Sequence, residues 1–218
     1  MDSHEDGGID IGEGGQFPIE EKVSQLWNSV PEDAEDKFSD EWLVPRFGKL
    51  SPDTGFLAVL SWGPHKVDRQ MAVWGKVKAK YSELATPLHS LTSSQAEALV
   101  ACYPLKQGWQ GKFLRGMTLY LRNSGKSMND VAADLKAGGS GFARAVLQDV
   151  FGTTSTKIID CYLRDVLLMD AFPIDSKVRR VLQKYGIPAD PAAIVAVCNK
   201  MGIDVRVLAR AVSAMDAK

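Results

Sequence analysis

The sequence predicts an all-α protein, and three observations support that class. Apolar residues recur every three or four positions, as at Val178, Val181 and Leu182, which is the spacing along one face of a helix. Glycine and proline fall where such helices would end, as in the Gly-Ile-Pro stretch at 186–188. No stretch alternates apolar and polar residues strictly, as a half-buried strand would.

One helical domain is expected to follow a flexible acidic tail. Residues 1–17 are rich in glycine and acidic side chains and offer little to bury, so we expect them to form the tail and residues 18–218 to form the domain. Periodicity and breakers predict helices at 19–29, 32–44, 53–62, 65–82, 93–103, 109–124, 127–136, 140–150, 157–169, 176–185, 191–201 and 203–215.

The charge of the chain is unevenly distributed. The formal net charge is only −1, but residues 1–41 carry 13 acidic and 2 basic side chains. Residues 42–218 therefore hold 14 of the 27 acidic residues and 24 of the 26 basic ones. A basic body of this kind is typical of a nucleic-acid binder, and the alternative is an ordinary solvated surface with a compensating acidic tail.

Several classes of protein are disfavoured by what the sequence lacks. The three cysteines are widely spaced and form no CxxC pair, which argues against a disulfide framework, a zinc finger and a four-cysteine iron–sulfur cluster. No phosphate-binding loop, GxSxG elbow or HExxH motif occurs. No apolar run approaches the ~20 residues of a membrane span, and the acidic N-terminus is unlike a secretory address. We therefore expect an intracellular protein.

The most informative stretch is a predicted helix-hairpin-helix at about 140–169. One helix ends near Val150, a short loop follows at 152–156 with the sequence Gly-Thr-Thr-Ser-Thr, and a second helix begins at Lys157. This geometry directs backbone N–H groups toward a DNA phosphate.

Lys157 and Asp175 each allow a structural and a chemical interpretation. A cation in the first turn of a helix faces the positive end of the helix dipole, which is unfavourable by roughly a few tenths of a kcal/mol, whereas a nucleophilic amine must be neutral. The alternative is a solvated lysine. Asp175 is placed to cap the helix that follows it, or to stabilise positive charge that develops on a sugar as its glycosidic bond breaks.

Taken together, these residues resemble the helix-hairpin-helix (HhH-GPD) DNA glycosylase superfamily, which includes endonuclease III and the 8-oxoguanine DNA glycosylases. The family signature is a hairpin, a lysine that starts the next helix in bifunctional members, and an aspartate in a Pro-hydrophobic-Asp turn. Here Lys157 is followed 18 residues later by Asp175, in the Phe-Pro-Ile-Asp turn at 172–175. The resemblance covers about 105–186 and is weaker over 54–104.

The resemblance implies a two-lobed helical fold with a DNA-binding cleft and two catalytic residues. Lys157 would attack the sugar and form a Schiff base, and Asp175 would assist base loss. Cys161 is similar to a cysteine that borders the base pocket in the 8-oxoguanine branch. Trp62 and Phe56, and with them Trp109, are candidates for stacking on the base in this pocket, and the alternative is that these aromatic side chains belong to the core.

DNA phosphates would be held by the hairpin. The residues expected to do so are Gly152, Thr153, Ser155 and Thr156. This loop departs from the family, because it keeps one glycine where two or three are usual and has hydroxyl side chains instead. The expected wedge at 62–65 lacks the usual polar pair. Further phosphate contacts are expected from basic residues, namely Lys66, Arg69, Lys112, Arg115, Lys177 and Arg179.

The expected function is excision of a damaged or modified base from double-stranded DNA by a monomer. An oxidised purine such as 8-oxoguanine is favoured, and a hypermodified cytosine of phage DNA is the alternative. No metal and no iron–sulfur cluster are expected, and a monovalent ion at the hairpin is the one cofactor considered. Such a protein would lie in the cytoplasm with the nucleoid, or in a nucleus. The competing interpretations are a non-catalytic DNA-binding module and a protein–protein adaptor that uses the acidic tail.

Overall fold

The computed structural model describes residues 18–62 and 67–215. Over those two ranges the chain forms twelve α-helices and one 3-10 helix, with no strand, so the all-α prediction is confirmed. The predicted tail at 1–17, the wedge residues at 63–65 and Lys66 lie outside the described residues. None of the described helices is long and apolar enough to cross a membrane.

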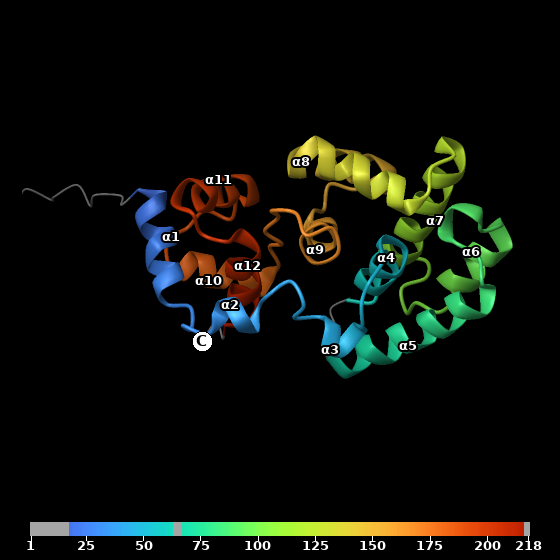
Figure 1. Cartoon of the computed structure of the whole chain (residues 1–218), viewed down its shortest axis with the longest axis horizontal. Helices are drawn as coiled ribbons and strands as arrows, with labels where there is room; N and C mark the ends of the chain where they lie inside the picture. Colours follow the sequence, from blue (N-terminus) through green and yellow to red (C-terminus); the bar gives the residue numbers. More distant parts are fainter. Residues whose placement is uncertain (1–17, 63–66, 216–218) are drawn as a thin grey trace, which may run out of the picture.

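The central group of helices surrounds a first hydrophobic core. Helix α4 lies in the middle of this group and is buried along the whole stretch 55–60, as expected of a helix that is apolar on all sides. It packs against α5, α8 and α9 (Figure 1). The group consists of α3 (Val44–Phe47), α4 (Pro52–Leu60), α5 (Val67–Leu84), η1 (Leu88–Ser90), α6 (Ser93–Val100), α7 (Trp109–Ser124), α8 (Met128–Phe151) and α9 (Lys157–Asp165).

The terminal group brings the two ends of the described chain together around a second core. Helix α1 packs against α11, and α2 packs against α12 (Figure 1). Val23 and Leu26 from the N-terminal side meet Phe172 and Leu208 from the C-terminal side, all fully buried. The group consists of α1 (Ile19–Asn28), α2 (Ala34–Lys37), α10 (Ser176–Lys184), α11 (Pro191–Met201) and α12 (Val205–Ala214).

The single helix predicted at 32–44 is wrong. The chain instead forms the two short helices α2 and α3 with turns between them. Its apolar side chains are buried in different places, because Phe38 packs with Val207 beside α12 whereas Leu43 packs into the central core. One straight helix could not serve both cores, so tertiary burial overrides local propensity here.

Two other differences from the predicted helices are larger than the shifts of one to three residues found at other helix ends. The predicted helices at 127–136 and 140–150 are joined in α8, but Gly139 inside it has φ 77° and ψ 170°, so the expected break is present as a kink. The helix predicted at 157–169 ends at Asp165. The chain then turns through Leu168, which has a positive φ of 55° without being glycine, and no residue in this apolar stretch signals the turn.

Candidate active site between the two helical groups

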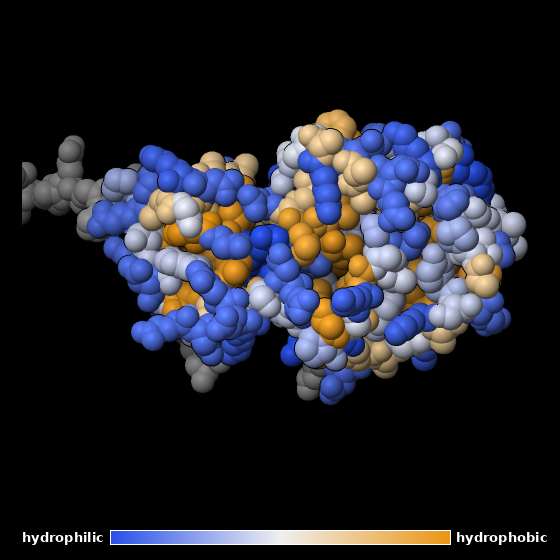
Figure 2. All heavy atoms as spheres, viewed as in Figure 1, coloured by the Kyte–Doolittle hydropathy of each residue, from blue (hydrophilic) through white to orange (hydrophobic). Residues whose placement is uncertain are grey.

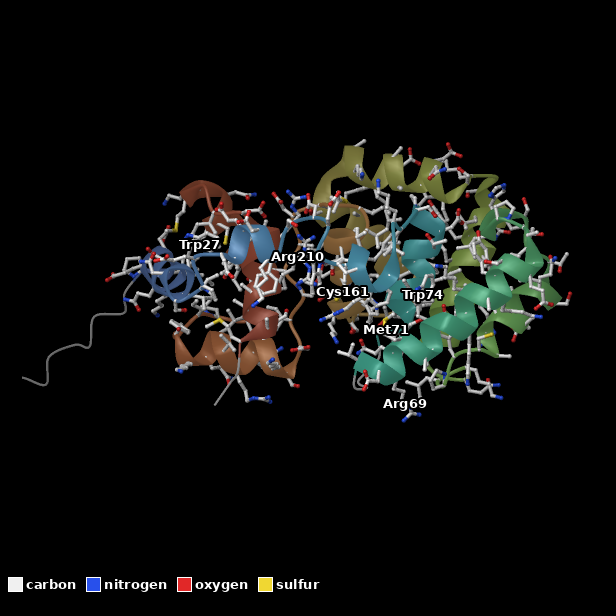
Figure 3. The ribbon with its side chains drawn as sticks, turned by 60° about the horizontal axis from the view of Figure 1, so that its bottom comes forward. Trp27, Arg69, Met71, Trp74, Cys161 and Arg210 are labelled. Carbon is white, nitrogen blue, oxygen red and sulfur yellow. The ribbon has the colours of Figure 1, made fainter. Side chains whose placement is uncertain are left out.

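A cavity of about 620 Å³ is lined by residues of both groups. This volume lies within the range of about 300–1,000 Å³ that small-molecule sites occupy. Cys161 on α9 and Arg210 on α12 line it and lie at facing edges of the two groups (Figure 3). In the space-filling view the outline narrows where the groups meet (Figure 2). The aromatic wall of the cavity comes from Phe38, Trp42, Phe47 and Trp62.

Lys157 and Asp175 both line this cavity, and their charged groups converge. Lys157 Nζ lies 3.7 Å from Asp175 Oδ2, and each side chain is little more than one-third exposed, at 36% and 38%. Lys157 is the first residue of α9, so its backbone position is set by the end of the hairpin. Residues 18 positions apart in the sequence thus face one space.

Asp175 caps a helix and faces the lysine at the same time. Its Oδ1 accepts hydrogen bonds from the backbone N–H groups of Lys177 and Val178, at 2.9 Å each, which satisfies two free amides at the start of α10. Its Oδ2 is the oxygen that points toward Lys157 Nζ. The structural and chemical interpretations of Asp175 therefore involve different oxygens of one carboxylate.

The turn before Asp175 is anchored on both sides. Phe172 is fully buried in the terminal core and Pro173 lines the cavity. Proline fixes its own φ and leaves no N–H to satisfy. The turn therefore holds Asp175 in place relative to both the core and the cavity.

The hairpin requires only one residue with left-handed backbone. Gly152 ends α8 with φ 55°, and none of the residues 153–156 has a positive φ. Threonine and serine can therefore occupy the positions after Gly152 without backbone strain. Within the loop, Thr153 Oγ1 accepts a hydrogen bond from Ser155 N at 3.1 Å, and Lys112 Nζ donates to Gly152 O at 2.7 Å.

The N-terminus of α9 has no side-chain cap. Thr156 occupies the cap position with φ −100° and ψ −21°, and its side chain accepts no hydrogen bond from the first turn. The first amides of a helix have no partner within the helix. In α9, a helix of nine residues, these amides have no side-chain cap and lie next to the hydroxyl-rich loop. An anion can bind to such an arrangement.

The two predicted pocket residues Cys161 and Trp62 line the cavity. Cys161 lies one turn after Lys157 on α9, and burial raises the pKa of its thiol to about 12. A thiol with this pKa stays protonated at neutral pH, so Cys161 contributes a wall and not a nucleophile. The ring of Trp62 contacts that of Phe47, with 5.5 Å between centroids.

The prediction of Phe56 as a pocket residue is not supported by its position. Phe56 is 2% exposed, stacks on Phe151 with 5.9 Å between ring centroids, and does not line the cavity. It belongs to the central core. Trp109, also considered for stacking on a base, packs edge-on against Phe113 and does not line the cavity either.

The basic residues expected at phosphates have different surroundings. Lys112 lies at the hairpin through its bond to Gly152 O. Arg115 forms an ion pair with Glu97. Arg69 is exposed and points away from the molecule (Figure 3). Arg179 is exposed on α10 and Lys177 is half-buried there. Of the five of these basic residues that the structure describes, Lys112 is the one with a hydrogen bond to the hairpin.

Sequence reasoning missed a buried cluster of Arg164, Asp165 and Arg210. Asp165 Oδ1 accepts from Arg164 Nε at 2.8 Å and from Arg210 Nε at 3.1 Å, and Asp165 Oδ2 accepts from Arg164 Nη2 at 2.6 Å. Arg210 Nη1 also donates to the backbone oxygens of Phe38 and Ser39. The cluster therefore joins α9, α12 and the segment after α2. Its one sequence signal is an arginine at position 210 within the otherwise apolar stretch 207–212 of α12.

We expect Asp165→Asn to destabilise the protein by about 3–5 kcal/mol, because it removes the ion-pair partner of the buried Arg164 guanidinium and leaves Arg210 with Asp40 alone. The measurement is urea unfolding. The control is Asp134→Asn, which removes the exposed ion pair with Lys126 and should change stability by less than about 1 kcal/mol. Equal effects of the two substitutions would contradict this description of the cluster.

No family model, no curated protein and no solved structure matches this chain. Over 18–62 and 67–215, no group of three or more histidine, cysteine, aspartate or glutamate side chains could hold a metal ion.

Proposed function

We propose that this protein is a DNA glycosylase that excises a damaged or modified base from double-stranded DNA and cleaves the strand through a Schiff base at Lys157. The observation that carries the proposal is the 3.7 Å approach of Lys157 Nζ to Asp175 Oδ2 at one cavity. An amine beside a carboxylate, in a space with aromatic walls, suits attack on a sugar whose base occupies that space.

The proposal includes the fold, which we assign to the two-lobed HhH-GPD class. The two hydrophobic cores, the cavity lined from both groups and the hairpin before α9 support a two-lobed HhH-GPD fold. In such a fold DNA lies across the junction, and the target base is turned out of the duplex. This extrusion costs a few kcal/mol and is easiest for a base whose pairing is already weakened.

The reaction follows from the two charged groups. Asp175 Oδ2 is close enough to accept a proton from the Lys157 ammonium after a small movement, which frees the nitrogen lone pair. The amine attacks C1′ while the glycosidic bond breaks, and the bonding electrons leave with the base, which takes the proton from Asp175. The carboxylate restored in this way stabilises the positive charge that remains on the sugar and its new nitrogen. Transfer of a proton from that nitrogen to O4′ opens the ring and gives the Schiff base, and loss of a C2′ proton then eliminates the 3′ phosphate.

The hairpin would hold the DNA backbone. The uncapped N–H groups at the start of α9 favour a phosphate, and the helix dipole adds to the attraction. The hydroxyl groups of Thr153 and Ser155 are further donors, whereas the Thr156 hydroxyl is hydrogen-bonded to Asp160. Lys112, at the hairpin, adds positive charge beside Gly152. Binding through these groups is independent of sequence and weakens with salt.

The second candidate function is a non-catalytic DNA-binding module. The uncapped hairpin favours it, because the same phosphate contacts would serve a protein that only binds DNA. Such a module would retain salt-dependent DNA binding after Asp175→Asn and would release no base. It gives no role to the Lys157–Asp175 pair, which is why the glycosylase is preferred.

The testing experiment is incubation with a panel of duplexes, each with one modified base, followed by mass spectrometry of the released bases. The panel contains 8-oxoguanine, the preferred substrate, and glucosylated 5-hydroxymethylcytosine, the alternative. We expect one modified base to be released and unmodified duplex to be left intact. Binding to every duplex without release of any base would support the non-catalytic module instead.

A further inference from the structure

Two buried hydrogen-bond donors at the cavity have no partner among the described residues. They are Arg164 Nη1 and Trp62 Nε1, and both residues line the cavity. Buried polar groups in folded proteins are almost always paired, so an unmatched donor calls for an explanation. The other buried atoms without a partner belong to residues that do not line the cavity, namely Asp53, His89, Asp160 and Arg206. The unmatched groups at the cavity are thus donors only.

The Arg164 guanidinium is held rigidly with one nitrogen unused. Arg164 Nε and Nη2 donate to the two oxygens of Asp165, at 2.8 and 2.6 Å. Asp165 is held in turn by Arg210, so the plane of the group is fixed. The Arg164 side chain is 5% exposed. A guanidinium has no acceptor and stays charged, so any partner of Nη1 must supply an acceptor oxygen or nitrogen.

Arg164 lies on the same face of α9 as the proposed nucleophile. Lys157, Cys161 and Arg164 are spaced by four and three residues, which places them in one stripe of the helix. All three line the cavity. A group that enters far enough to bring a sugar to Lys157 therefore presents its base along the wall that contains Cys161 and Arg164.

We propose that Arg164 determines specificity by donating a hydrogen bond from Nη1 to a carbonyl oxygen of the extruded base, with Trp62 Nε1 as a second donor. The cavity then accepts bases that present two acceptors, such as oxidised guanines and uracil derivatives. It discriminates against bases that present no carbonyl oxygen there, because the two buried donors would then stay unpaired. This inference rests on the proposed function and defines the substrate class of the same site.

A phosphate oxygen of the DNA backbone is the other acceptor that a guanidinium could bind. The depth of Arg164 argues against it, since its side chain is nearly inaccessible whereas the backbone of a bound duplex stays outside. Abasic DNA distinguishes a base acceptor from a phosphate acceptor, because it keeps every phosphate and lacks the base.

The experiment compares Arg164→Met with the wild type on two reactions. The first is base release from duplexes with 8-oxoguanine, 5-hydroxymethyluracil or 1,N6-ethenoadenine, of which only the last has no carbonyl group. The second is strand cleavage at a preformed abasic site. We expect the wild type to release a carbonyl-bearing base and not ethenoadenine. Arg164→Met should slow that release roughly 10- to 100-fold, the loss typical of one hydrogen bond to a charged group, and change abasic cleavage less than about twofold.

Two further variants test whether the loss of base release in Arg164→Met reflects only a structural change. Trp62→Phe keeps the ring and removes the second donor, and it should slow base release several-fold with abasic cleavage unchanged. Arg206→Met is the matched control, because Arg206 also has a buried unmatched nitrogen but does not line the cavity. It should leave both reactions unchanged.

Several outcomes overturn the assignment to Arg164. They are equal loss of both reactions in Arg164→Met, unchanged base release, preferred release of ethenoadenine, and abasic cleavage by a wild type that releases none of the three bases. A wild type that neither releases a base nor cleaves abasic DNA refutes the proposed function itself. The two failures are therefore distinguishable.

Discussion

Replacing Lys157 by glutamine is expected to abolish borohydride trapping on abasic DNA and to reduce strand cleavage by roughly a thousandfold or more. Glutamine has a similar length but no basic nitrogen, so it cannot form the Schiff base that borohydride reduces. The side chain is 36% exposed and starts a helix, so the free energy of unfolding should change by less than about 0.5 kcal/mol. Trapping is measured as a covalent protein–DNA band on a denaturing gel.

Lys37→Gln is the matched control for this prediction. Lys37 also lines the cavity and carries the same charge, but it belongs to α2 in the terminal group and not to α9. The control variant should trap abasic DNA as the wild type does. Undiminished trapping in Lys157→Gln would rule out Lys157 as the nucleophile, and lost trapping in Lys37→Gln would move that role to α2.

Asp175→Asn should lower the single-turnover rate of base excision by roughly 10²- to 10³-fold while the fold is retained. The substitution removes the negative charge that stabilises the sugar cation and accepts the lysine proton. Asparagine is as good a helix cap as aspartate, and its side-chain oxygen can accept from the amides of Lys177 and Val178. Affinity for unmodified duplex should therefore stay close to that of the wild type.

The structure offers a close control in Asp190→Asn. Asp190 caps α11 through the amides of Ala192 and Ala193, in the same way as Asp175 caps α10, and it does not line the cavity. Both variants lose one charge at a helix N-terminus, and only Asp175→Asn should lose activity. Equal excision rates in the two variants would show that Asp175 is a structural cap and nothing more.

The helical class and the meeting of Lys157 with Asp175 could be anticipated from short-range patterns. Helix periodicity, one glycine after α8 and a proline two residues before Asp175 are all local signals, and together they describe helix, hairpin, helix and turn. The distance of 3.7 Å between the two charged groups could not be derived from them, because it depends on how α9 and α10 are anchored in different cores.

The contrast between Phe56 and Trp62 shows where sequence patterns become ambiguous. Both lie in one apolar stretch, so both were candidates for stacking on a base. The structure buries Phe56 against Phe151, whereas Trp62, just after the end of α4, lines the cavity. Which apolar side chain faces a core and which faces a cavity depends on the neighbouring helices, and periodicity does not specify them.

The buried cluster of Arg164, Asp165 and Arg210 could not be predicted from the sequence, for a different reason. Its members come from α9 and α12, and the backbone oxygens that complete it follow α2, so more than 170 positions separate its extremes. An adjacent Arg-Asp pair is ordinary on a solvated surface. The pair is buried here because the fold packs α9 against the segment after α2 and against α12.

The most direct test of the central claim is to identify the residue that becomes attached to DNA. Wild-type protein would be reduced with borohydride on an abasic duplex, digested with protease and sequenced by mass spectrometry. We expect the sugar remnant to be found on Lys157. A remnant on any other lysine, or on the chain's amino terminus, would contradict the claim that Lys157 and Asp175 act on one deoxyribose.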